Sequence, residues 1–240
     1  MVQNGQITLY SSPYSPFTHR VRIALDQANA DYTQFVIDFT NKPSWYAEKI
    51  NPVGKVPAIT YGGPKSTPEN PPTESAKINE SLVILELLAD LFPEANLLPS
   101  DPILRAQARL FINVFESKAF DGFKDFCFIY VKGSDKTLLD GLEALQARLP
   151  PTGFAVGPEW TNADSAVAPF LVRLDLMLKH DIGCYPQEEG AAVLEALRGA
   201  RFARLTKYID DIMQSPVFKP TWDEEMNLKL IKLNPAVQRK

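Results

Sequence analysis

Residues 7–28, ITLYSSPYSPFTHRVRIALDQA, decide the fold of the N-terminal part of this chain because they join a strand pattern to a helix pattern across one short turn. The apolar run QITLY at 6–10 is typical of a buried strand. The segment 16–28 is typical of a helix, and Pro16 occupies its first position, where proline is well tolerated. A second strand pattern, YTQFVID, follows at 32–38. Strand, helix and strand at this spacing predict a right-handed βαβ unit.

The rest of the N-terminal part continues to alternate strands and helices. The polar stretch around 42–46 predicts one or two helical turns, and PAITY at 57–61 predicts a third strand, in which a proline is tolerated only at the start. SAKI at 75–78 predicts a short fourth strand, and SLVILELLADLF at 81–92 predicts an apolar helix. The intervening GGPKSTPENPPTES at 62–75 is too rich in proline and glycine for a strand and predicts an exposed loop.

Beyond residue 93 the pattern changes, which divides the chain into two predicted domains. We expect a mixed α/β domain at 1–93, a linker at 94–102 and an all-helical domain at 103–240. Helical periodicity covers five stretches of the second part: 103–130, 136–148, 164–180, 190–213 and 223–232. Thr161 and Asp164 have the spacing of an N-terminal capping box and are assigned to folding of this domain.

Composition excludes several classes of function. With 240 residues, 45% apolar, the chain can bury a sizeable core, and its net charge of −4 offers no basic excess for nucleic acid or for a membrane surface. No apolar run reaches the roughly 18 residues of a membrane span. Cys127 and Cys184 lie in no metal-ligand spacing, so we expect no metal site and two buried free thiols. These features predict a cytoplasmic protein.

The turn SSPYSPF at 11–17 has three interpretations. Ser15 followed by Pro16 is most simply a helix cap. Ser15 and His19 are also spaced i, i+4, as a catalytic dyad would be, although no acidic residue is evident to orient the imidazole. In the third interpretation, the helix N-terminus attracts an anion. The Ser15 hydroxyl can accept from a backbone N–H and still donate its own proton to a bound thiolate.

The predicted first helix has two distinct faces at 100° per residue. One face gathers the apolar side chains Phe17, Val21, Ala24, Leu25 and Ala28. The opposite face carries Ser15, His19, Arg22 and Asp26. We expect the first face to pack on the sheet and the second, His19 included, to face solvent.

Four motifs, in order along essentially the whole chain, resemble the glutathione transferases. SPFTHRVRIAL resembles their first helix, in which Ser precedes Pro-Phe in the tau class and Cys precedes it in the omega class. NKPSWYAEKINPVGKVPAI at 41–59 is similar to the omega segment leading to a Val-Pro pair, and NES at 79–81 to the Glu-Ser pair that holds the γ-glutamyl end. EWTNADSAVAPF at 159–170 is similar to the capping segment of the helical domain. The chain therefore resembles an omega-like transferase, a serine-type variant with a tau-like Ser-Pro-Phe; the Asn-Lys-Pro-x-Trp run favours the omega class over the tau-like alternative.

The resemblance implies a thioredoxin-like N-terminal domain, a helical C-terminal domain and glutathione as co-substrate. It implies that Ser15 donates a hydrogen bond to the glutathione sulfur and that Phe17 contacts glutathione. Val56 would pair with the cysteinyl unit through its backbone, ahead of a cis Pro57. Without the resemblance, Pro57 is simply a strand start, and cis X–Pro bonds are uncommon.

The two ends of glutathione would be bound by charged and polar side chains. The resemblance implies that Glu80 pairs with the γ-glutamyl ammonium and Ser81 with the adjacent carboxylate. An acidic residue and a cap in the first turn of any helix would look identical. Lys42 would reach the glycyl carboxylate, although a solvated lysine is the default interpretation.

A pocket for a hydrophobic second substrate is less readable from the sequence. Six phenylalanines lie within 111–128, with the spacing of a core helix, yet all six cannot face one side and some could line an apolar cleft. The candidates for the pocket are Tyr14, Phe123 and Trp222.

The residue before Pro-Phe separates the possible activities. A serine hydroxyl cannot form the mixed disulfide through which omega-class thiol transfer proceeds. We therefore expect conjugation of glutathione to hydrophobic electrophiles, or peroxide reduction by glutathione, with little thiol transfer. Two alternatives are a ligandin-type protein that binds hydrophobic or aromatic small molecules and an interaction module with no ligand. The resemblance also implies a homodimer.

Overall fold

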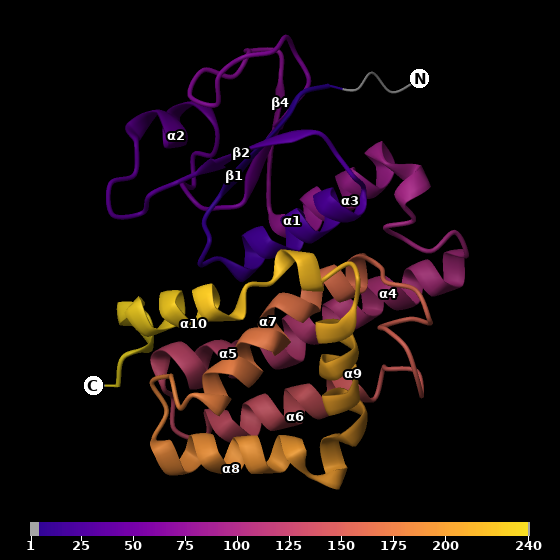
Figure 1. The fold of residues 1–240 in the computed structure, drawn as a ribbon, viewed down its shortest axis with the longest axis vertical. Helices are drawn as coiled ribbons and strands as arrows, with labels where there is room; N and C mark the ends of the chain where they lie inside the picture. The colour runs from indigo at the N-terminus through magenta and orange to yellow at the C-terminus, as the bar shows by residue number, and fades with distance from the viewer. Residues whose placement is uncertain (1–4, 240) are drawn as a thin grey trace. The chain divides into compact units, whose positions relative to one another are not determined.

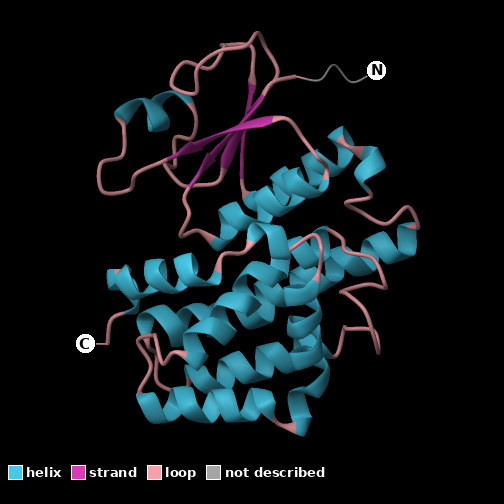
Figure 2. Ribbon diagram, viewed as in Figure 1, coloured by secondary structure: helices cyan, strands magenta, loops and turns pink. Residues whose placement is uncertain are grey.

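The computed structural model describes residues 5–239, and the chain divides into two compact units, Met1–Leu97 and Leu98–Lys240. The first contains every strand of the described chain, and the second is helical (Figures 1 and 2). The predicted fold class, a thioredoxin-like unit followed by an all-helical unit, is confirmed. None of the helices within residues 5–239 is long and apolar enough to cross a membrane.

The sheet of the first unit has four strands in the order β2-β1-β3-β4. Strand β1 (Ile7–Ser11) continues through helix α1 (Pro16–Gln27) into the parallel strand β2 (Tyr32–Val36), which confirms the βαβ unit. Strand β3 (Ala58–Tyr61) is antiparallel to both β1 and β4 (Ala76–Asn79). The third strand begins one residue after Pro57, so the proline stays outside the ladder, as its missing N–H requires.

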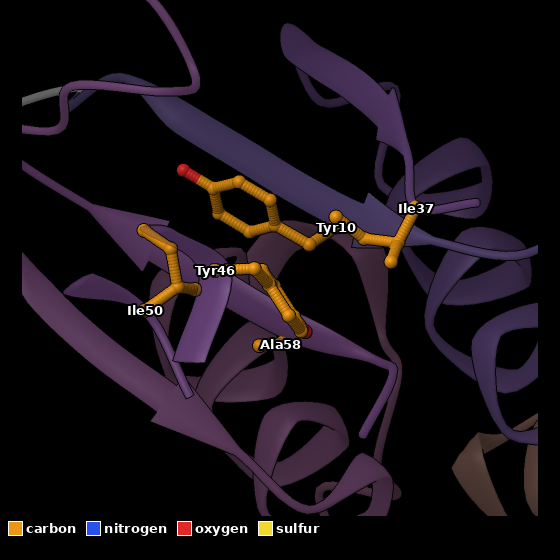
Figure 3. Packing of buried hydrophobic residues seen from close by; sticks show 5 residues of the cluster. All are labelled: Tyr10, Ile37, Tyr46, Ile50 and Ala58. Carbon is orange, nitrogen blue, oxygen red and sulfur yellow. The ribbon is translucent and has the colours of Figure 1, made fainter. Parts of the chain in front are cut away.

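Two apolar layers cover this sheet. On one side, α1 packs against α3 (Ser81–Leu91), whose buried residues include Ile84, Leu85 and Leu88. On the other side, α2 (Ser44–Lys49) supplies Tyr46 to a cluster that Figure 3 shows close up: Tyr10, Ile37, Tyr46, Ile50 and Ala58. Strand β1 is buried on both faces, so it forms the centre of the unit.

The prediction that His19 faces solvent is wrong. Val21, Ala24 and Leu25 are buried as expected, but the side chains of His19 and Arg20 are only 4% and 1% exposed. Helix α1 packs against α3, and the Arg20 guanidinium reaches Ser81 Oγ there, so more of the surface of α1 is covered than a single apolar face predicts. Asp26, at the other end of that polar face, is exposed.

The segment 62–75 is irregular, as predicted, but it is fastened to the sheet. The Gln6 side chain donates to the Ser66 carbonyl at 3.2 Å and accepts from the Ser66 N–H at 2.9 Å. The Tyr10 hydroxyl donates to the Pro68 carbonyl at 2.6 Å. Burial raises the pKa of Tyr10 to about 12, so this donor keeps its proton at neutral pH.

The second unit is built from seven α-helices within the described residues, together with shorter π and 3-10 segments. The α-helices are α4 (Pro102–Val114), α5 (Phe120–Lys124), α6 (Ser134–Gln146), α7 (Asn162–Lys179), α8 (Gln187–Arg198), α9 (Ala203–Gln214) and α10 (Glu224–Leu233). The π segments are η2 (Phe115–Ala119) and η3 (Asp125–Ile129). The 3-10 segments are η1 (Pro93–Ala95), which still belongs to the first unit, η4 (Ala200–Phe202), η5 (Lys219–Thr221) and η6 (Pro235–Val237).

Two helix predictions in this unit need correction. The single helix expected at 190–213 is α8 and α9 separated by η4, because Gly199 adopts an extended backbone that ends α8. The helix expected at 103–130 contains the two π segments, which lie in the phenylalanine-rich stretch. Cys127 and Cys184 are free, as predicted, but only Cys127 is fully buried.

The phenylalanine-rich stretch is mainly core. Phe111, Phe115, Phe123 and Phe126 are buried, whereas Phe120 and Phe128 are half-buried. Phe170 on α7 makes ring contacts with three of them: Phe115, Phe120 and Phe123. Aromatic packing of this kind stabilises the unit beyond the area that it buries.

The capping box at the start of α7 is confirmed and extends into a buried network. Asp164 Oδ2 accepts from the N–H and hydroxyl of Thr161, and Oδ1 accepts from the Ala155 N–H and the Tyr208 hydroxyl. Four donors thus converge on one carboxyl group. Burial raises the pKa of Asp164 to about 6 in spite of these bonds.

The raised pKa gives the stability of the protein a specific pH dependence. Since the folded pKa of Asp164 lies above the ordinary aspartate value of 3.8, the native state binds the proton more tightly than the unfolded state. The contribution of Asp164 is therefore complete below the unfolded pKa and falls by about 3 kcal/mol as the pH rises through 6. We expect Asp164→Asn to be destabilised throughout, with the gap to wild type narrowing between pH 4 and 7, measured by urea unfolding.

The exposed Asp90→Asn on α3 serves as the control, and its gap to wild type should change far less with pH. A gap for Asp164→Asn that widens as the pH rises would contradict the prediction.

Candidate functional site

The strand register brings three segments of the first unit to one edge of the sheet. Tyr10, near the end of β1, pairs with Ala58 at the start of β3, and Ala58 pairs with Asn79 at the end of β4. Because α1 follows β1, the loop 51–57 precedes β3 and α3 follows β4, all three segments meet at this edge. A pocket of about 150 Å³ lies there, lined by Phe17, Asn51, Val53, Lys55, Val56, Pro57, Asn79, Glu80 and Ser81.

Five of these lining residues were candidates from the sequence: Phe17, Val56, Pro57, Glu80 and Ser81. The Val56–Pro57 peptide bond is cis, as the resemblance implied. None of the hydrogen bonds that hold residues 5–239 together uses the backbone N–H or C=O of Val56. A half-buried residue with both backbone groups unused can pair with a peptide-like ligand, as an edge strand does.

The loop that presents Val56 is held by buried side chains. The Lys55 carbonyl accepts from the Tyr46 hydroxyl at 2.7 Å and from Asn51 Nδ2 at 2.8 Å. Asn51 Oδ1 accepts from the Val53 N–H at 3.2 Å and from Asn79 Nδ2 at 2.9 Å. Burial raises the pKa of Tyr46 above its usual range, so its hydroxyl remains a donor. These bonds tie the loop both to α2 and to the end of β4.

The start of α3 supplies an anion-binding end to the pocket. Ser81 is the first residue of the helix, and backbone N–H groups in a first turn have no partner within their helix. Its side chain is 6% exposed, and its Oγ accepts from Arg20 Nη1 at 3.2 Å. Glu80 precedes it with a φ of 66°, a conformation that costs about 1–3 kcal/mol for a residue other than glycine. Glu80 is exposed and lines the pocket.

Ser15 caps α1, as the simplest interpretation of the turn predicts. Its Oγ accepts from the Thr18 N–H at 3.2 Å, and Pro16 fills the first helical position. The residue is half-buried and is not among those lining the pocket, although Phe17, in the same helical turn, is. The cap uses the hydroxyl oxygen only as an acceptor, so the hydroxyl proton can still be donated.

The predicted lysine does not line the pocket. Lys42 is exposed, and its ammonium donates to the Gly54 carbonyl at 3.2 Å, which fastens the far side of the loop 51–57. Gly54 has a φ of +69°, and a Cβ there would lie 2.8 Å from Lys42 Nζ, so glycine suits both the turn and the close approach. The cation that lines the pocket is Lys55.

The three candidates for a hydrophobic pocket have different surroundings. Tyr14 is 50% exposed beside Ser15. Phe123 is 5% exposed and packs against Phe128 and Phe170, which favours a role in the core. Trp222 is half-buried, with its ring stacked on Phe218 and facing the Arg173 guanidinium at 5.2 Å. A role for any of them in substrate binding stays a prediction.

Sequence patterns missed Asn51, Lys55, Asn79 and Arg20. Asn51 and Lys55 lie within the motif NPVGKVP and Asn79 begins NES, so membership of recognised motifs was the available signal. Arg20 gave no signal, since an arginine in an amphipathic helix is ordinarily solvated. Across residues 5–239, no three His, Cys, Asp or Glu side chains form a group that could hold a metal ion.

Comparisons with known proteins cover both units. The family model of the glutathione S-transferase N-terminal domain matches residues 9–96, and that of the glutathione S-transferase C-terminal domain matches 130–211. Glutathione transferase Omega 2S from Trametes versicolor is 45% identical, with a TM-score of 0.91 over 98% of this chain and 99% of that chain. That protein has also been solved in complex with 2,4-dihydroxybenzophenone.

Two further relatives extend the comparison. Glutathione transferase Omega 2C from Trametes versicolor is 46% identical, with a TM-score of 0.88 over 95% of this chain and 97% of that chain. The pyrimidodiazepine synthase of Drosophila melanogaster is 29% identical over 222 residues, 89% of this chain and 79% of that protein.

The role of Asn51 in holding the pocket loop can be tested directly. Asn51→Ala removes three hydrogen bonds and leaves the half-buried Asn79 amide without its acceptor. We expect a loss of about 1–3 kcal/mol in unfolding free energy. We also expect faster hydrogen–deuterium exchange of the amides in 51–57. The exposed Asn113→Ala on α4 should alter neither quantity, and unchanged exchange in Asn51→Ala would show that the loop does not depend on this side chain.

Proposed function

Because this chain belongs to the glutathione S-transferase family, as an omega-class glutathione transferase, we propose that it activates the thiol of glutathione with the hydroxyl of Ser15. The observation that carries the proposal is the cap of α1. The Ser15 oxygen accepts from the Thr18 N–H, so its proton is free to be donated to a sulfur anion at the helix N-terminus.

The energy available at this position matches what activation requires. A free thiol has a pKa near 8.5, and lowering it by about two units, so that most of it is thiolate at neutral pH, requires about 2.7 kcal/mol. A hydrogen bond to a charged group supplies about 1.5–3 kcal/mol. A helix N-terminus adds about 0.3–1 kcal/mol. The serine and the helix together are therefore sufficient without a general base.

The rest of the pocket suits the chemistry of glutathione. Val56 would pair with the cysteinyl unit through its unused backbone groups, next to the cis Pro57. Ser81 and the first turn of α3 would bind the γ-glutamyl carboxylate, with Glu80 near the ammonium. Phe17 would pack against the bound tripeptide. Either Lys42 or Lys55 would attract the glycyl carboxylate, and the lining of the pocket favours Lys55.

The reaction that this arrangement supports best is attack by the glutathione thiolate on an electrophile. Conjugation forms a carbon–sulfur bond while the electrophile accepts an electron pair or loses its leaving group. Reduction of a peroxide by glutathione is the second form of the same chemistry. Thiol transfer is disfavoured because Ser15 cannot form a mixed disulfide.

A second candidate function is the binding of aromatic small molecules with weak or no catalysis. The observation that favours it is the complex of the 45% identical Omega 2S transferase with 2,4-dihydroxybenzophenone. Tyr14 in the first unit is 50% exposed, and Trp222 in the second unit is half-buried, so each ring by itself keeps surface that an aromatic ligand can contact. The two functions are separated by the state of the bound glutathione sulfur.

The surface of α4 and the two cysteines bear on the oligomeric state and the cellular location of the protein. We propose a two-fold homodimer, supported by exposed aliphatic side chains on α4, where Ile103 and Leu110 are seven residues apart and so lie on one face. A cytoplasmic location agrees with the two free thiols, Cys127 and Cys184.

The ultraviolet absorbance of bound glutathione thiolate, followed against pH, tests the role of Ser15. In wild type we expect the thiol pKa to fall by about two units from its free value. Ser15→Ala should lose that shift together with about 0.5–2 kcal/mol of stability from the missing cap. Ser15→Asp should retain the cap yet also lose the shift, because a carboxylate repels a thiolate. A normal thiol pKa in wild type, with tight binding of 2,4-dihydroxybenzophenone, would instead favour the binding protein.

Replacing the serine by cysteine tests the limit on thiol transfer. We expect Ser15→Cys to reduce a mixed disulfide substrate with glutathione at least tenfold faster than wild type, because a cysteine thiolate can form the required intermediate. Conjugation to a chlorinated dinitrobenzene should not rise in parallel. Equal thiol-transfer rates in the two proteins would show that the residue before Pro-Phe does not select the reaction.

A further inference from the structure

The buried side chain of Arg20 contacts two residues that line the proposed glutathione site. It lies on α1 with 1% of its surface exposed, and its Nη1 donates to Ser81 Oγ at 3.2 Å. Its guanidinium also faces the ring of Phe17 at 5.2 Å. Ser81 and Phe17 both line the pocket, so one buried cation contacts two of its walls.

The chemistry of this contact restricts the Ser81 hydroxyl. A hydroxyl has one proton and two lone pairs and can act as donor or acceptor, whereas a guanidinium has only donors and stays charged at every accessible pH. With Arg20 donating to its oxygen, Ser81 cannot direct its proton toward Arg20. The proton has to be donated elsewhere, and the pocket lies beside this largely buried side chain.

We propose that Arg20 is a positioning residue that fixes Ser81 as a hydrogen-bond donor toward the carboxylate at the γ-glutamyl end of glutathione. The proposal rests on the proposed function, because it takes that carboxylate to be the ligand of Ser81. The proposal also gives α1 a role at both ends of the glutathione site. The same helix carries Ser15 at its cap and Arg20 one turn further along, so a single element would set the sulfur end and the carboxylate end together.

A double-mutant cycle on glutathione affinity, measured by isothermal titration calorimetry, tests this role. We expect Arg20→Met and Ser81→Ala each to weaken glutathione binding about tenfold or more, the loss expected for one hydrogen bond to a charged group. The double variant should bind no more weakly than Ser81→Ala alone, because Arg20 acts through Ser81. Arg20→Lys, which also has only donors, should retain affinity within about threefold.

Two controls separate positioning from general damage. Arg22→Met, on the same helix but only half-buried, should leave the affinity within about twofold. Urea unfolding of each variant shows whether it is folded. If Arg20→Met does not fold, the cycle is run with Arg20→Gln, whose carbonyl can accept the Ser81 proton and so turn it away from the pocket.

The outcomes distinguish failure of the proposed function from failure of the role assigned to Arg20. Wild type that does not bind glutathione overturns the proposed function itself. Wild type that binds, with losses from Arg20 and Ser81 that multiply in the double variant, overturns the role of Arg20 while leaving the proposed function intact. If Arg20→Met weakens glutathione binding as much in the Ser81→Ala background as in wild type, the role of Arg20 is likewise overturned.

Discussion

The pairing of Tyr10 with Ala58, and of Ala58 with Asn79, is the constraint on which the rest of the site depends. It aligns the end of β1, the start of β3 and the end of β4 at one edge of the sheet. A one-residue slip in either ladder would turn every side chain of a strand to the opposite face and would displace the loop or helix that follows it. The buried cluster around Tyr10 and Tyr46 opposes such a slip because it fills one face with aromatic side chains.

That edge is suited to an anionic peptide because two helices begin there. Helix α1 begins directly after its cap, Ser15, and α3 begins after Glu80, and each directs the positive end of its dipole toward this edge. The loop between them offers the unused backbone groups of Val56, held by Asn51 and the Lys55 carbonyl. In the proposed function, helix ends, backbone groups and a few charged side chains would bind the peptide, and Ser15 alone would act on the sulfur.

Much of this arrangement was readable from the sequence because it depends on local patterns. The βαβ unit followed from periodicity, and Ser15 as a cap followed from a serine placed before a proline. Tyr208, by contrast, completes the Asp164 network from 44 residues away in sequence, and no sequence pattern near Thr161 indicates this partner. The burial of Arg20 was likewise not indicated by local patterns, since its partner Ser81 lies 61 residues further along the chain.

The sequence by itself therefore determined the order of the elements, the family resemblance and the residues that begin each helix, because propensity, capping and periodicity act over a few residues. Tertiary structure alone decided that Lys55 rather than Lys42 lines the pocket, that Asn51 holds its loop and that Arg20 is buried against Ser81. Each of these depends on which side of a packed element a side chain lies, and that is set by contacts between segments far apart in the chain.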